Sequence, residues 1–133
     1  MTAGRFPASL REVMTAGEAL KITPQVAALF SALPGCSLFN QYGPTECHVV
    51  TQLTLTGNPA DWPALPTIGR PIANTTITIC DDAGHALPTG EPGELCISGL
   101  CLAEGYWRQP TLTADKFVYR TNTAGPPIRT YRT

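Results

Sequence analysis

The sequence predicts a mixed α/β fold, in which a partial parallel β–α–β layer is followed by a β-barrel-like part. Three observations predict this class. Apolar residues make up 43% of the 133-residue chain and charged residues only 14%, so the chain can bury a core. Strand, helix and strand patterns follow one another within about thirty residues near the beginning, as in a β–α–β unit. Thirteen Pro and twelve Gly suit many short strands joined by tight turns.

The first strand is predicted over Leu10–Ala16, and Gly17 ends it. Thr23 is placed to cap the following helix, and Pro24 is the favoured first residue. The apolar positions of that helix form one stripe before Pro34 stops it: Val26, Leu29, Phe30 and Leu33. A second short strand is predicted over Ser37–Asn40. Because the crossover of a β–α–β unit joins parallel strands, both strands are expected to end at the same edge of the sheet.

Later segments are mostly β-like. A strand is predicted over Cys47–Leu55, and the proline-rich stretch Gly57–Thr67 reads as a loop that joins two structural units. The remaining expected elements are strands over Thr75–Asp81 and Glu94–Ser98, a possible strand over Leu100–Ala103, a short helix over Thr111–Val118 and a strand from Ile128 to Thr133. The predicted units are residues 1–60 and 61–133.

Composition excludes several functional classes. Nine Lys and Arg against ten Asp and Glu give a net charge of −1, so a nucleic acid or an anionic membrane is not expected as a partner. No apolar run is long enough to span a bilayer, and the first twenty residues lack the apolar core of a signal peptide, so we expect a cytoplasmic protein. Five cysteines without a CxxC spacing are expected to be reduced and mostly buried.

Two loops are expected at the edge where the parallel strands end. One contains Gly17 and Glu18, and the other runs from Tyr42 to Glu46. Ligands of open α/β sheets bind beyond the carboxyl ends of the strands. The first loop also fits a plain strand-to-helix turn that needs Gly17 only for its backbone freedom. The second loop combines an aromatic ring, a hydroxyl and a carboxylate, which favours a binding site over a polar turn.

Three segments resemble successive signature motifs of the amino-acid adenylation domains of nonribosomal peptide synthetases. Asn40–Glu46 reads NQYGPTE, Gly93–Gly99 reads GELCISG and continues to AEGY at Ala103–Tyr106, and Tyr131–Thr133 reads YRT. The connecting segments match as well, so the resemblance covers nearly the whole chain. The resemblance implies an internal fragment of the core of an adenylate-forming enzyme. Residues 1–60 would end the second α/β subdomain, and residues 61–133 would form most of a β-barrel-like subdomain truncated at its C-terminus.

The resemblance implies a two-step reaction that uses ATP, Mg²⁺ and a phosphopantetheine thiol on a partner carrier domain. A substrate carboxylate attacks the α-phosphorus of ATP, and the activated acyl group then passes to the thiol. Glu46 is the only carboxylate of the strand-end loop, and we assign it to magnesium, a hard cation that takes few protein carboxylates. The resemblance places the Thr45 hydroxyl on the α-phosphate, so Thr45 and Glu46 are the expected catalytic residues.

The resemblance also implies the remaining binding residues. It places the Tyr42 ring on the adenine face and Asn40 at the exocyclic amine of adenine, and Gly17 and Gly43 complete the expected nucleotide site. The expected wall of the acyl pocket comprises Met14, Ala16, Gln41, Val49 and Val50. Met14 and Ala16 are two apart on a strand and therefore share a face, whereas Val49 and Val50 also fit ordinary strand packing.

The family's phosphate loop and its catalytic lysine have no counterpart in this sequence, so the chain is expected to be inactive on its own. His48 and His85 receive no catalytic role, because an ionised substrate carboxylate needs no base. Two other functions stay open. One is an acyl-CoA ligase-like piece that acts on a carboxylic acid without an amino group, and the other is a non-catalytic interaction module with a vestigial site.

Overall fold

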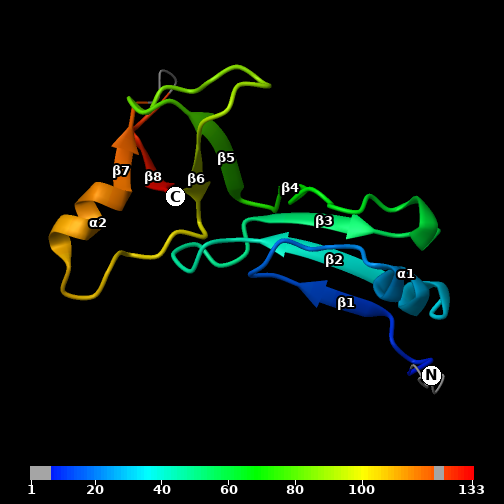
Figure 1. The fold of residues 1–133 in the computed structure, drawn as a ribbon. Helices are drawn as coiled ribbons and strands as arrows, with labels where there is room; N and C mark the ends of the chain where they lie inside the picture. The colour runs from blue at the N-terminus through cyan, green and yellow to red at the C-terminus, as the bar shows by residue number, and fades with distance from the viewer. Residues whose placement is uncertain (1–6, 122–124) are drawn as a thin grey trace. The chain divides into compact units, whose positions relative to one another are not determined.

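The computed structural model describes residues 7–121 and 125–133 of the chain. In these residues it shows a mixed α/β fold with two four-stranded sheets, which confirms the predicted class (Figure 1). In chain order the elements are β1 (Glu12–Thr15), α1 (Pro24–Ser31), β2 (Ser37–Tyr42), β3 (Thr51–Leu55), the 3₁₀ turn η1 (Pro59–Asp61), β4 (Arg70–Pro71), β5 (Thr75–Cys80), β6 (Glu94–Gly99), α2 (Pro110–Lys116), β7 (Phe117–Arg120) and β8 (Ile128–Arg132).

The chain divides into two compact units. The first unit comprises the residues up to Tyr42 together with Thr51–Arg70, and the second comprises Gly43–Val50 together with Pro71–Thr133. The proline-rich loop at residues 57–67 lies in the first unit, and the chain passes to the second unit after Arg70. The division of the chain into residues 1–60 and 61–133, as subdomains of a larger core, stays a prediction.

The sheet of the first unit has the strand order β1-β2-β3-β4. Strands β1 and β2 run parallel, with Met14 opposite Phe39 and Thr15 opposite Asn40, which confirms the predicted parallel pair. Strand β3 returns antiparallel to β2. Since β1 and β2 are parallel, the residues that follow them leave the sheet at one edge, as the sequence predicts.

Helix α1 forms where the sequence places its signals. The Thr23 hydroxyl accepts a hydrogen bond from the Val26 amide at 3.3 Å, and Pro24 is the first helical residue. One face of the helix packs into a core centred on the buried Phe30, Leu33, Cys36, Leu38 and Leu55. The Trp62 ring lies 5.1 Å from the Phe30 ring and closes this core from the loop after β3. The apolar stripe read from the sequence is therefore the buried face.

The sheet of the second unit is antiparallel, with the strand order β5-β6-β8-β7. In the described part of the chain these four strands form an open sheet, which is the only barrel-like part of the fold seen there. Its buried residues include Cys96, Ile97, Phe117, Thr130 and Tyr131. The Ser98 and Thr130 hydroxyls form a hydrogen bond with each other at 2.8 Å, so each has a partner within the sheet. The second unit thus has a core of its own.

Two predicted strand segments are wrong. The strand predicted to begin at Cys47 begins at Thr51. Residues 45–47 form a turn, in which the Cys47 amide donates to the Pro44 carbonyl at 3.0 Å, and His48 has a positive φ of 56°. Such a backbone cannot continue a strand, whatever the β propensity of the side chains.

The possible strand over residues 100–103 is absent, because the chain turns after β6. Gly99 has a φ of +132°, and the Leu100 amide donates to the Asn74 carbonyl at 3.2 Å. The predicted helix over residues 111–118 ends at Lys116, since Phe117 and Val118 pair with β8 instead. Strand β7 is not predicted by the local sequence pattern, because it forms by pairing with β8, a strand further along the chain.

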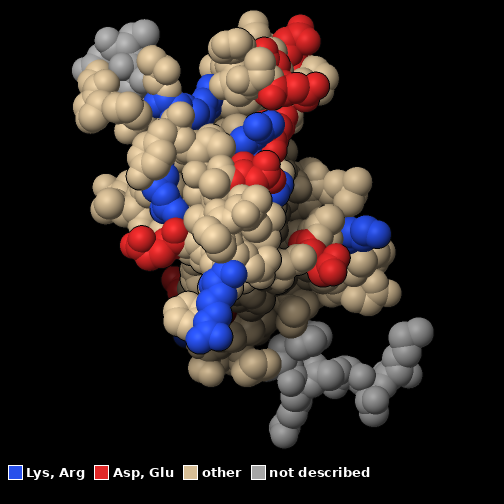
Figure 2. Space-filling view, turned by 90° about the vertical axis from the view of Figure 1, so that its left-hand side faces the viewer, with Lys and Arg blue, Asp and Glu red and all other residues tan. Residues whose placement is uncertain are grey.

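Charged side chains are sparse on the surface. On the face shown in Figure 2, basic and acidic side chains are interspersed among uncharged surface. This agrees with the balanced composition of nine basic and ten acidic residues. Within the described residues, no helix is long and apolar enough to cross a membrane.

Candidate functional site

The first unit positions one half of the predicted site residues at the edge where β1 and β2 end. Met14 stands opposite Phe39 in the parallel register, and side chains alternate between faces along each strand, so Met14 and Gln41 share one face of the sheet. Met14 is 62% exposed there, and Ala16 and Gly17 follow directly after β1. Gly17 has a φ of +89°, which favours glycine. Their roles in binding stay predictions.

Asn40 is buried in the first unit, with only 5% of its surface exposed. Its Nδ2 donates a hydrogen bond to the Thr67 carbonyl at 2.9 Å. Within the described residues its Oδ1 receives no hydrogen bond from the protein. Since the amide orientation is fixed through Nδ2, the carbonyl oxygen is left to accept a hydrogen bond from an amino group, which is the role that the resemblance implies.

Gln41 has a partner that the sequence did not reveal. Its Nε2 donates to Oε1 of Gln52 at 2.8 Å, and the two residues are directly opposite in the antiparallel register of β2 and β3. Two glutamines directly opposite each other on neighbouring strands are expected to form such a hydrogen bond. The sequence does not give the register of β2 and β3, so it could not show that Gln41 and Gln52 are opposite. The pair fixes the Gln41 side chain on the face that also carries Met14.

The second unit contains the loop that follows Tyr42. Gly43 begins this loop, and a Cβ at this position would lie 1.5 Å from the His48 carbonyl oxygen. The beginning of the loop therefore packs directly against its end, and any side chain at Gly43 would force them apart. Thr45 is exposed, and within the described residues its hydroxyl has no hydrogen-bond partner in the protein. The loop thus presents a free hydroxyl next to Glu46.

Glu46 is the best-supported residue of this loop. The Tyr106 hydroxyl donates a hydrogen bond to its Oε1 at 2.5 Å, and the Ala103 amide donates to its backbone carbonyl at 2.8 Å. The Tyr106 hydrogen bond is the main cause that lowers the pKa of the Glu46 carboxyl, and it raises the pKa of the Tyr106 hydroxyl in turn. Glu46 is therefore ionised at neutral pH.

The donor set around Glu46 fits a magnesium ion that takes most of its ligands from phosphate. Within the described residues, no group of three or more His, Cys, Asp or Glu side chains could form a metal cage. Mg²⁺ is usually held by one or two carboxylates plus substrate phosphates and water. A single ionised carboxylate beside a free hydroxyl meets that requirement, so Glu46 is the residue that would hold the ion.

Val49 and Val50 lie at the end of the same loop. Val49 is half-buried, whereas Val50 is fully buried within the second unit and its carbonyl accepts a hydrogen bond from the Ile72 amide at 3.0 Å. His48 is exposed and His85 sits in a turn, where its ring lies 3.3 Å from the Asp81 carboxylate. The assignment of Val49 and Val50 to an acyl pocket stays a prediction.

A parallel strand pair is followed in the chain by a loop that carries the ionised Glu46 carboxylate and the exposed Thr45 hydroxyl. The sequence model of the family described as "AMP-binding enzyme" matches residues 2–107. The chain therefore belongs to the AMP-binding enzyme family.

Relatives and solved structures specify the resemblance. Tyrocidine synthase 2 of Brevibacillus parabrevis is 47% identical over 126 residues, which are 94% of this chain and 3% of that protein. Gramicidin S synthase 2 of Brevibacillus brevis is 42% identical over 130 residues, which are 97% of this chain and 3% of that protein. The chain thus spans about 3% of the length of these relatives.

Two solved structures share the fold. The structure of holo-PA1221, described as an NRPS protein containing adenylation and PCP domains, has a TM-score of 0.78 and 31% identity, with 93% of this chain and 21% of that chain covered. The nonribosomal peptide synthetase FmoA3 has a TM-score of 0.79 and 30% identity, with 95% and 13% covered. The resemblance to the adenylation domains of nonribosomal peptide synthetases, predicted from the three motifs, is confirmed.

Proposed function

We propose that this chain is part of an adenylation domain that activates an amino acid with ATP and passes the aminoacyl group to a phosphopantetheine thiol. The observation that carries the proposal is the loop at Glu46, where the ionised carboxylate follows directly in sequence after the exposed Thr45. The family membership and the PCP domain of PA1221 support the adenylate-forming chemistry and the carrier partner.

The first step joins a carboxylate to the α-phosphorus. A substrate carboxylate oxygen forms a bond to the α-phosphorus of ATP, and the bond to the β-phosphate oxygen breaks, so pyrophosphate leaves with its electron pair. Both reactants are anionic, so the reaction needs charge neutralisation and positioning more than covalent help. A magnesium ion, when bound, would offset that charge. Glu46 would hold the ion, and the Thr45 hydroxyl would donate a hydrogen bond to an α-phosphate oxygen.

Residues at the end of β2 are proposed to bind the adenine ring. The Tyr42 ring offers a face for stacking, and the free Oδ1 of Asn40 accepts a hydrogen bond from the exocyclic amine. The Thr67 carbonyl, which accepts from Nδ2 of Asn40 at 2.9 Å, holds the amide in the required orientation. Because Gly17 and Gly43 have no side chains, the nucleotide could approach the backbone closely at these two positions.

The acyl substrate is proposed to contact Met14, Ala16 and Gln41 of the first unit and Val49 of the second, whereas Val50 is fully buried and would act only by packing. Met14 supplies an exposed apolar surface, and Gln41 supplies a carboxamide that Gln52 already binds through one hydrogen bond. Met14 and Gln41, which share one face of the first unit's sheet, suit a substrate side chain with apolar surface and one polar group. The second step breaks the acyl–phosphate bond of the adenylate, forms a thioester with the carrier thiol, and releases AMP. Cytoplasmic location stays a prediction.

The test is ATP–pyrophosphate exchange by a complete adenylation domain that includes this chain, compared with the purified 133-residue chain. We expect exchange that depends on an amino acid in the complete domain, and no measurable exchange in the chain alone. The chain alone lacks the phosphate loop and catalytic lysine, and loss of one such charge-stabilising group typically costs about a hundredfold or more.

The substrate panel separates the candidate functions. It should contain the amino acids and matched carboxylic acids without the amino group. Exchange only with the latter would favour an acyl-CoA ligase-like enzyme. If the complete domain shows no exchange with any acid, the enzyme proposal fails. Exchange by the 133-residue chain alone would disprove its predicted incompetence.

A further inference from the structure

The contact between Tyr106 and Glu46 joins two parts of the second unit that are sixty residues apart in the sequence. At 2.5 Å, the hydroxyl-to-carboxylate distance is typical of the short, charge-assisted class of hydrogen bond. The Tyr131 hydroxyl and the Glu46 backbone amide also lower the pKa of the Glu46 carboxyl, but the Tyr106 hydroxyl has the largest effect. The Tyr106 hydroxyl therefore holds Oε1 of the carboxylate most directly.

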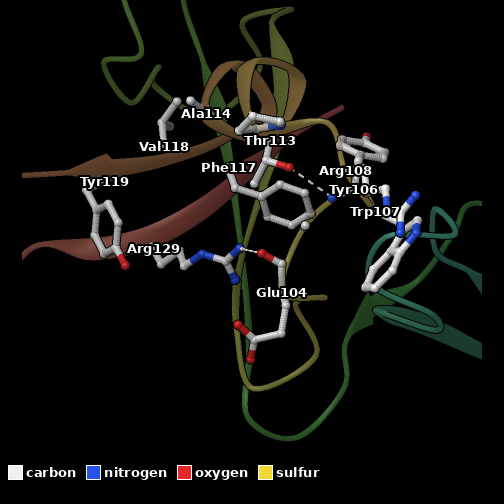
Figure 3. A pocket seen from close by; sticks show the side chains of 12 residues that line it. Glu104, Tyr106, Trp107, Arg108, Thr113, Ala114, Phe117, Val118, Tyr119 and Arg129 are labelled. Carbon is white, nitrogen blue, oxygen red and sulfur yellow. Dashed lines mark hydrogen bonds between the residues drawn. The ribbon is translucent and has the colours of Figure 1, made fainter.

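The segment 103–106, which brings Tyr106 to the loop, is itself fastened at several points. The Ala103 amide donates to the Glu46 carbonyl at 2.8 Å. From strand β8, the Arg129 guanidinium donates to the Ala103 carbonyl at 2.8 Å. It also donates to the Glu104 carbonyl at 2.7 Å, as Figure 3 shows. Its guanidinium also lies 4.5 Å from the centre of the Phe117 ring. A residue of the sheet therefore holds the backbone of the same segment that contacts the loop.

The position of the Tyr106 side chain is fixed by its immediate neighbours. Its backbone amide donates to the Thr113 hydroxyl at 2.9 Å, an interaction visible in Figure 3. Gly105 allows the close approach, because a Cβ there would lie 2.4 Å from a methyl carbon of Thr113 and the residue has a φ of +149°. The ring packs edge-on against Phe117 at 5.8 Å. Packing and hydrogen bonds thus hold the ring before the hydroxyl meets Glu46.

We propose that Tyr106 is a positioning residue for adenylation, whose hydroxyl fixes the Glu46 carboxylate in the orientation that holds the nucleotide-bound cation. The inference rests on the proposed function for its catalytic meaning. A glutamate on a loop would otherwise sample several rotamers, and each turnover would have to order it again. Holding one oxygen in advance removes that cost.

The test uses Tyr106→Phe, which removes the hydroxyl and keeps the ring that packs on Phe117. Tyr119→Phe is the matched control, because Tyr119 lies on β7 of the same unit and is 71% exposed. In the complete domain, we expect Tyr106→Phe to lower kcat about tenfold, as loss of one hydrogen bond to a charged group would. The half-saturating Mg²⁺ concentration should rise, while KM for the amino acid and the melting temperature stay near those of Tyr119→Phe.

A second readout does not depend on activity. In the 133-residue chain, amide hydrogen exchange at Cys47 and Ala103 reports on the loop and on its contact with segment 103–106. We expect Tyr106→Phe to accelerate exchange at both amides relative to Tyr119→Phe. Equal exchange in the two variants would show that the hydroxyl does not hold the loop, and would overturn the inference even if the complete domain proved inactive.

The kinetic result separates this inference from the proposed function. If the complete domain adenylates an amino acid but Tyr106→Phe keeps the kcat and magnesium dependence of Tyr119→Phe, the inference fails and the proposed function stands. A loss of activity that follows a fall in melting temperature would also overturn it, since the role of Tyr106 would then be structural. If the domain adenylates no acid, the proposed function fails and the exchange measurement decides whether Tyr106 holds Glu46.

Discussion

Burial controls the chemistry of the cysteine side chains. All five are free thiols, and four of them are buried, as the sequence predicts. Burial is the main cause that raises the pKa of the Cys47 thiol to about 12, and the neighbouring Cys101 and Glu46 raise it further. Burial likewise raises the pKa of Cys96 to about 12, with Cys80 as its neighbour. Because the thiolate is the reactive form, these thiols are unreactive at neutral pH in the folded chain.

We therefore predict that iodoacetamide at pH 8 modifies Cys101, which is only half-buried, well before the other four cysteines. The raised pKa of Cys47 and Cys96 keeps these thiols protonated at pH 8, and burial shields all four buried thiols from the reagent. Peptide mass spectrometry of samples taken over time measures the order. In urea all five should react at similar rates. Early modification of Cys47 or Cys96 in the native chain would contradict the structure.

At the scale of elements, the turn before β4 depends on a close backbone approach at Gly69. Gly69 has a φ of +81°, and a Cβ at this position would lie 2.1 Å from the Gln52 carbonyl oxygen on β3. Gly57 has nearly the same φ, +80°, but nothing lies within 4 Å of a Cβ there. A side chain at either glycine would be strained by the positive φ, but only a side chain at Gly69 would also collide with backbone. The two positions therefore separate the effect of the φ from the effect of the collision.

We predict that Gly69→Ala lowers the free energy of unfolding far more than Gly57→Ala. The positive φ costs each variant about 1 to 2 kcal/mol. The contact with backbone, which cannot move aside as a side chain can, adds roughly 1 to 3 kcal/mol or more at Gly69 only. Urea unfolding of both variants and the unchanged chain measures the difference. Equal losses would show that the turn does not pack on β3 in this way.

Elements with local signals could be predicted from the sequence. The first helix was found because Thr23, Pro24 and the apolar stripe all act within a few residues of one another. The start of β3 was misplaced because Val49 and Val50 are β-branched, while the backbone at Gly43 and His48 is set by packing within the loop. In such places tertiary packing overrides intrinsic propensity.

The candidate site shows the same limit. The motif at residues 40–46 identified the loop, and the side-chain chemistry of Glu46 suggested its role. The partners of these residues could not be predicted, since Thr67, Gln52 and Tyr106 reach them through pairing that is distant in sequence. Tyr106 stood inside a recognised motif, and only the folded unit shows that its hydroxyl binds a carboxylate sixty residues away.

At the scale of the whole molecule, the chain is a portion of the adenylation fold with two separately packed units. The chain covers 21% of the PA1221 chain. The proposal assigns nucleotide-binding roles to Asn40 and Tyr42 at the end of β2 and to Thr45 and Glu46 in the loop that follows. The account therefore depends on the behaviour of Glu46 in the complete domain.

The most direct test is the substitution Glu46→Gln in the complete adenylation domain, measured by the adenylation rate at saturating magnesium. Gln keeps an oxygen that can accept from the Tyr106 hydroxyl but removes the charge, so the melting temperature should change little. Glu104→Gln is the matched control, because Glu104 is an exposed glutamate of the same unit. We predict that Glu46→Gln lowers turnover roughly a hundredfold or more, equivalent to about 3 to 4 kcal/mol in the transition state, while Glu104→Gln retains it. Near-normal turnover of Glu46→Gln, or a loss explained by unfolding, would contradict the assignment of Glu46 to the metal.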